Sequence, residues 1–310
     1  MMSSMRAIAT TLLVLGLSTA AHADEPAMFA EQPGTHGFLY EVRPKKDAGA
    51  LRLYVFGTIH IGNSSQTPFT HAVRAALAAS KQIALEADPS DLGGIARALG
   101  PSVLYPKEDS LDRHVPAATM AELRKALPRV QLEEARVLRM RLWLVPMAIG
   151  LAEGEKLGLS GSYGTEVYLA AWAKSHAVPI VELEGAEAQM KLISSEPEDL
   201  QLDALVDTLH EMETGESTKK LQKIVRAWND ADVKAAEDIV RVAHASKRRS
   251  EREFALRMLD DRNVKMADRA EEILRSGKTT FLAVGTAHLF GDKGLIALLR
   301  KRGYNVAAIR

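Results

Sequence analysis

The stretch YVFGTIHIG, residues 54–62, returns near the other end of the chain as LAVGTAHLFG, residues 282–291. Each copy begins with a short apolar run of strand-forming residues and continues into Gly-Thr-x-His. Each is then followed by a loop, a helical pattern and another apolar strand. A strand, a helix and a strand in succession form a βαβ unit, in which parallel strands are joined by a right-handed crossover. The repeat therefore predicts an α/β fold with two related halves.

Further strand patterns flank and separate these units. Gly37–Val42 precedes the first unit across a turn that contains Pro and Gly, and Val178–Leu183 lies in the middle of the chain. The rest of the middle, about residues 91–276, is mostly helical and rich in charge. We therefore expect a single domain over residues 24–310, with a mixed sheet and a large helical insertion. The two units are predicted over Leu51–Phe56, Thr70–Ser80 and Gln82–Glu86, and over Thr280–Val284, Leu295–Arg302 and Asn305–Ile309.

The first 23 residues are typical of a cleavable signal peptide. Arg6 precedes an apolar run, and Ala21-His22-Ala23 forms an A-x-A cleavage site before Asp24. The run is shorter than a membrane span, although an uncleaved anchor is the alternative. We expect an exported protein, periplasmic or secreted, with no stable membrane insertion after cleavage.

Composition excludes several classes of function. The 310 residues carry 40 basic and 40 acidic side chains, which argues against a broad nucleic-acid surface. No cysteine is present, so thiolate chemistry and cysteine-based metal sites are excluded. The sequence also lacks a G-x-S-x-G elbow, a Walker motif and a dinucleotide-binding fingerprint. Any metal must be held by His, Asp, Glu and water.

His60 and His288 are the first candidates for a site. Each follows its motif glycine by three residues, beyond the carboxyl end of a predicted strand. Ligands of open α/β sheets bind at that edge. Either histidine alone is more simply explained as a hydrogen-bonded structural residue, but the matched pair favours a shared site.

Carboxylates follow two further predicted strands. Glu86 ends QIALE, whereas Glu182 and Glu184 lie in VPIVELEG and are expected on the same face of that strand. Both of the latter could instead be solvated if the strand ends at Val181. Two imidazoles with one or two carboxylates predict a site for Zn, Mn, Co or Fe.

The chain resembles the TraB/GumN-type family, to which the Tiki-type metalloproteases are related. The resemblance rests on GTIH, LEAD, GSYGTE, VELEGAEAQM, DRN and the terminal block FLAVGTAHLFGDKGLIALLRKRGYNV. It implies an α/β fold and a metal-dependent hydrolase. It also implies that the motif residues His60, His288 and Glu86 carry the site, and it marks Glu166, Glu184, Gln189 and Arg262 as further recurring positions.

We therefore expect a peptide-cleaving hydrolase whose divalent metal is bound by His60, Glu86 and His288. Glu184 or Glu166 is the expected general base, and Arg262 the partner of an oxyanion or a carboxylate. On chemistry alone an arginine on such a helix is usually solvated, so only the resemblance singles out Arg262. The alternatives are a non-catalytic protein that holds haem or a metal, and a degenerate scaffold that binds a partner.

Overall fold

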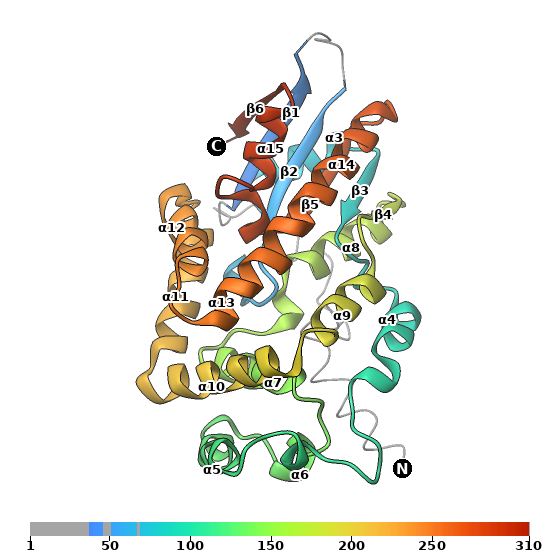
Figure 1. Cartoon of the computed structure of the whole chain (residues 1–310). Coiled ribbons are helices and arrows are strands. Elements are labelled where there is room, and N and C mark those ends of the chain that lie inside the picture. Colours follow the sequence, from blue (N-terminus) through green and yellow to red (C-terminus); the bar gives the residue numbers. More distant parts are fainter. Residues whose placement is uncertain (1–36, 46–50, 67–68, 310) are drawn as a thin grey trace.

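A computed structural model describes residues 37–45, 51–66 and 69–309. A β-sheet with its covering helices forms one end of the molecule, and a group of helices forms the other (Figure 1). The predicted signal peptide, Met1–Ala23, and the predicted cleavage point before Asp24 lie outside the described residues.

Six strands form one mixed sheet in the order β4-β3-β5-β2-β1-β6. The four strands β4, β3, β5 and β2 are parallel, whereas β1 is antiparallel to both β2 and β6. The predicted α/β class with a mixed sheet is confirmed. The strands are β1 (Phe38–Pro44), β2 (Leu53–Thr58), β3 (Gln82–Leu85), β4 (Ile180–Glu182), β5 (Thr280–Gly285) and β6 (Tyr304–Ile309).

Strand neighbours differ from those implied by the two βαβ units. β2 and β3 do not pair, because β5 lies between them and hydrogen-bonds to both. β6 pairs with β1 instead of β5. The two strands of each unit still run parallel, but each crossover spans intervening strands. The reason lies in burial: every residue of β2 and β5 is buried, so these two strands occupy the centre of the sheet.

The helices divide between two hydrophobic clusters. The first surrounds the sheet and includes apolar side chains of α3, α8, α14 and α15. The second is built by the middle of the chain, from helices such as α5, α7 and α10. No helix in the described ranges is both long and apolar enough to cross a membrane. The helices are α3 (His71–Ala79), α4 (Leu92–Leu99), α5 (Ala117–Ala126), α6 (Glu134–Val137), α7 (Leu144–Lys156), α8 (Thr165–Ser175), α9 (Ala186–Ser194), α10 (Glu198–Thr214), α11 (Glu216–Asn229), α12 (Val233–His244), α13 (Arg249–Phe254), α14 (Asp261–Arg275) and α15 (Leu295–Lys301).

Candidate functional site

The two Gly-Thr-x-His motifs lie side by side because their strands, β2 and β5, are parallel neighbours. Gly57 is opposite Val284, and Thr58 is opposite Gly285, so the copies are offset by one residue. The Thr286 hydroxyl of one motif donates to the Thr58 carbonyl of the other at 2.8 Å. A Cβ at Gly57 would stand 2.8 Å from that hydroxyl oxygen, so glycine is needed for the motifs to approach.

Three of the predicted residues surround the backbone of Gly285. Its N–H donates to Oε1 of Glu86 at 2.6 Å. A Cβ at Gly285 would lie 3.4 Å from Glu86 Oε1, 3.4 Å from His60 Nε2 and 3.6 Å from His288 Cδ2. The structure therefore brings both motif histidines and the glutamate that follows β3 to one point, at the carboxyl edge of the sheet.

The His288 ring and the Glu86 carboxylate lie too far apart to form a direct hydrogen bond. His288 Nε2 is 3.8 Å from Glu86 Oε1, beyond hydrogen-bonding distance. In the part of the chain that the structure describes, no three His, Asp or Glu side chains converge closely enough to hold a metal ion. The ligand roles given to His60, Glu86 and His288 therefore remain predictions.

His60 is held by the carboxylate of Glu166, with Nδ1 2.7 Å from Oε1. Glu166 follows Thr165 at the start of α8, and this turn is tied to the end of β2. The Ile59 N–H donates to the Thr165 hydroxyl at 2.9 Å, and the Thr165 N–H donates to the Ile59 carbonyl at 2.9 Å. The adjoining Glu166 raises the pKa of His60 to about 9. Burial would raise the pKa of Glu166, but the nearby imidazolium lowers it below its ordinary value.

His288 has a different environment. It is only 4% exposed, and burial lowers its pKa to about 4, so the ring is neutral near pH 7. Its Nδ1–H donates to the side-chain oxygen of Asn263, on α14, at 2.7 Å. The lone pair of Nε2 is thereby left free on the side of Glu86. Sequence reasoning assigned no role to Asn263, although its place in the DRN motif beside Arg262 was a usable signal.

Arg262 is buried, at 7% exposure, unlike the solvated arginine that is usual on a helix of this kind. Its guanidinium donates to both oxygens of Glu184, at 3.0 and 3.1 Å from Nε, and Nη2 also pairs with Glu86. Gln189 on α9 adds a hydrogen bond to Glu86 Oε2 at 2.9 Å. Two carboxylates, brought from distant parts of the sequence, compensate the buried charge of the arginine.

These contacts keep Glu86 ionised. Burial raises the pKa of its carboxyl, but His288 and the permanently charged Arg262 outweigh burial and hold the pKa at about 2. Both oxygens accept hydrogen bonds, Oε1 from Gly285 and Oε2 from Gln189 and Arg262. Glu86 is therefore a fixed negative charge between the two histidines.

Of the two glutamates in VPIVELEG, Glu184 contacts Arg262 beside Glu86, whereas Glu182 does not. The strand ends at Glu182, whose exposed side chain accepts the N–H of Asp88 at 2.7 Å. Glu184 lies beyond the strand, where its N–H and that of Gly185 donate to the Glu86 carbonyl at 3.1 and 2.9 Å. The expectation that both carboxylates share one face of a strand is wrong, because the strand ends at Glu182 and Glu184 lies in the turn before Gly185, where φ is +89°.

Comparison with known proteins agrees with the motifs. Residues 40–308 match the model of the TraB/PrgY/gumN family. The uncharacterized protein YbaP of Escherichia coli strain K12 is 25% identical over 252 residues, which cover 81% of this chain and 89% of the relative. A protein of the same name from Shigella flexneri matches with the same identity and coverage. No solved structure matches the chain.

Proposed function

The chain belongs to the TraB/PrgY/gumN family, and from that premise we propose that it is an exported, metal-dependent hydrolase that cleaves peptide bonds. One observation carries the proposal. Each motif imidazole has its Nδ1 beside an oxygen acceptor, Glu166 or Asn263, while Nε2 remains free of hydrogen bonds near Glu86. A hydrogen bond from one ring nitrogen to an acceptor fixes the tautomer and orientation of a histidine that binds a metal through its other nitrogen.

The donor atoms suit a divalent metal. His288 would offer a neutral nitrogen, His60 would offer one once a metal displaced its proton, and Glu86 would offer an ionised oxygen. Zn, Mn, Co and Fe use such a ligand set. His288 Nε2 and Glu86 Oε1 face each other at 3.8 Å without a proton to share, because the imidazole is neutral and the carboxylate ionised. Both atoms are acceptors and repel each other, and a cation bound between them would remove this repulsion.

The surrounding residues position these three side chains. Arg262, Gln189 and the Gly285 N–H hold Glu86, so its carboxylate cannot rotate freely. The His60 side chain is 59% exposed, whereas that of His288 is 5% exposed, so substrate and water would reach the site from the His60 side.

A bound metal would polarise the scissile carbonyl and lower the pKa of a bound water to about 7. Glu184 and Glu166 are the candidates for the general base, and the structure holds each beside a cation, Arg262 or His60. Arg262 already serves two carboxylates, which favours its role as a carboxylate partner over that of an oxyanion partner.

Elemental analysis of the purified protein tests the proposal. His60→Ala and His288→Ala should each lose most of the bound metal and the peptidase activity, while circular dichroism remains unchanged. His71→Ala, an exposed histidine at the start of α3, is the matched control and should keep both.

Two results would refute the metal-dependent reading. One is that the protein binds none of Zn, Mn, Co or Fe, and the other is that both variants retain full metal content. A Soret band without turnover would instead favour the haem-binding alternative.

A further inference from the structure

The outward face of α11 carries a basic groove separate from the histidine site. Lys219, Lys223 and Arg226 are all exposed, and they recur at the spacing that places side chains on one side of a helix. Together with Gln222 and the start of α12 they line a groove of about 420 Å³. Side chains at this spacing are neighbours, so the three positive charges repel one another.

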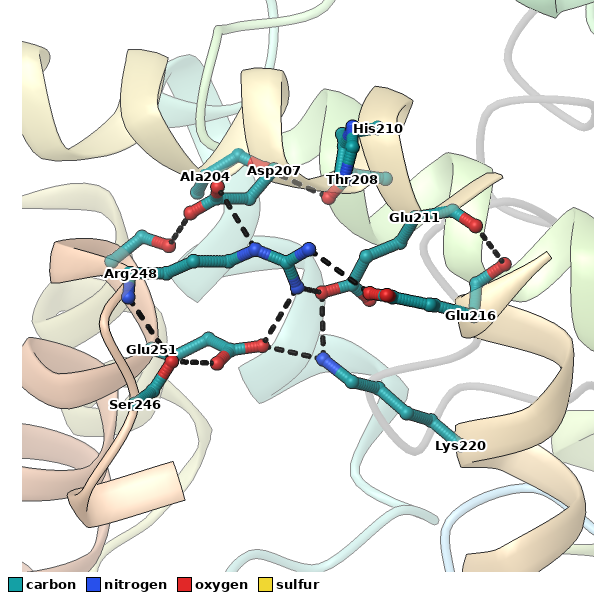
Figure 2. Close-up of polar contacts among 12 residues, drawn as sticks. Ala204, Asp207, Thr208, His210, Glu211, Glu216, Lys220, Ser246, Arg248 and Glu251 are labelled. Carbon is teal, nitrogen blue, oxygen red and sulfur yellow. Dashed lines mark hydrogen bonds and ion pairs between the residues drawn. The ribbon is translucent and has the colours of Figure 1, made fainter. Parts of the chain in front are cut away.

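None of these three cations has an ion pair among the described residues, whereas Lys220, which follows Lys219 on the same helix, has two. Lys220 contacts Glu211 at 2.6 Å and Glu251 at 2.5 Å (Figure 2). Arg248 lies in the same network and contacts Glu216 at 3.0 Å. Glu211, Glu251 and Glu216 are therefore already paired with other cations, so they do not neutralise the three positive charges of the groove.

The acidic side chains at the groove do not cancel this charge. Asp232 lines it, but its carboxylate caps α12 by accepting the Ala235 N–H at 3.0 Å. Asp230 also lines the groove without an ion pair to Arg226. Three cations thus face two acids, one of which is engaged in a helix cap.

The stripe is linear, and this indicates the shape of its ligand. From Lys219 to Arg226 the helix rises about 10 Å, at 1.5 Å per residue. Alternate side chains of an extended peptide point to one side and are about 6.8 Å apart. Two or three carboxylates on one face of such a peptide would match the length of the stripe.

We propose that this groove binds an acidic peptide segment in an extended conformation. The groove is a separate site, and its occupancy does not depend on the hydrolase proposal. Its Arg226 end lies towards the sheet, because α11 continues into Trp228, whose indole N–H donates to the Gly57 carbonyl at 2.8 Å. A peptide in the groove would therefore run along the helix that braces the first motif.

Fluorescence anisotropy with a labelled peptide of alternating Glu and Ser tests the proposal on the full-length protein at low and at physiological salt. The acidic peptide should bind, the affinity should fall as salt rises, and a Lys/Ser peptide should not bind. The double variant Lys223→Glu/Arg226→Glu should weaken binding by about tenfold or more, since two attractive exposed pairs become repulsive. Lys174→Glu, an exposed lysine on α8, is the matched control and should bind as the unmodified protein does.

Three outcomes would overturn the proposal: no binding at low salt, equal weakening in the control, or displacement by inorganic phosphate at concentrations at which free glutamate has no effect. Repeating the titration with His288→Ala separates the two sites. Peptide binding should survive in that variant, so failure of the groove and failure of the hydrolase proposal give different results.

Discussion

Arg262→Leu tests whether one buried guanidinium holds the carboxylate cluster together. It leaves Glu86 and Glu184, whose side chains are 11% and 14% exposed, without their cation. Removing one partner of a buried pair costs about 3–5 kcal/mol. The pKa of Glu86 agrees in direction, because burial raises it, whereas His288, Arg262 and His60 together lower it to about 2.

Urea denaturation of metal-free protein measures this loss. The matched control is Arg269→Leu on the same helix, whose guanidinium contacts Glu272 at 2.6 Å, the distance of Arg262 from Glu184. That pair is exposed, so its removal should change the free energy of unfolding by less than about 1 kcal/mol. Equal losses in the two variants would refute the reasoning.

The difference in the free energy of unfolding between the unmodified protein and Arg262→Leu should also depend on pH. The folded-state pKa of Glu86 is depressed, so its stabilisation is present above about pH 4.5 and is lost as pH falls towards 2. Without Arg262, burial favours the protonated carboxyl of Glu86. The stability lost in the Arg262→Leu variant is therefore partly regained as pH falls. The gap between the two proteins should therefore be smaller at pH 4 than at pH 7, and a gap that is unchanged would contradict the assignment. Adding Glu86→Gln and Glu184→Gln to the variant should restore much of the loss.

Three other predictions concern the motifs, the catalytic roles and export. Gly57→Ala should lower the free energy of unfolding by about 1–3 kcal/mol, measured by urea denaturation, because the new methyl group would stand 2.8 Å from the Thr286 hydroxyl oxygen. Glu86→Gln should weaken metal binding and turnover together, whereas Glu184→Gln should keep the metal and lose about 10²–10⁴-fold in rate; metal content and peptidase rate decide, and the reverse pattern would exchange the roles. Exported material should begin at Asp24 by N-terminal mass analysis, and retention of the first 23 residues would contradict cleavage.

The sequence was informative where a local pattern carries a structural meaning. The repeated Gly-Thr-x-His placed both histidines at strand ends, and the apolar run before Glu86 identified a third strand. Strand order was not accessible in this way, because the neighbours of a buried strand depend on which distant apolar segments fit beside it. Nothing near β2 in the sequence shows that β5 separates it from β3.

The polar half of the site shows the same limit. Arg262 looks like a solvated helix residue until Glu86 and Glu184 are placed beside it, and both are distant in the sequence. Asn263 has a role only because His288 packs against its helix. Burial of a charge depends on its partners, and these partners come from tertiary structure.

The central position of β5 has a consequence for how the chain acquires its structure. Gln82 and Thr280, whose side chains hydrogen-bond across β3 and β5 at 3.1 Å, are 198 residues apart. Until the last part of the polypeptide has been synthesised, β2 and β3 each present an unpaired edge to solvent. Closing so long a loop is slow, and contacts of such high sequence separation delay folding. A chain that is truncated before β5 would also lack α15 and β6, and it would leave edges of β1, β2 and β3 unpaired. Such exposed edges make it prone to aggregation and a target for quality-control proteases.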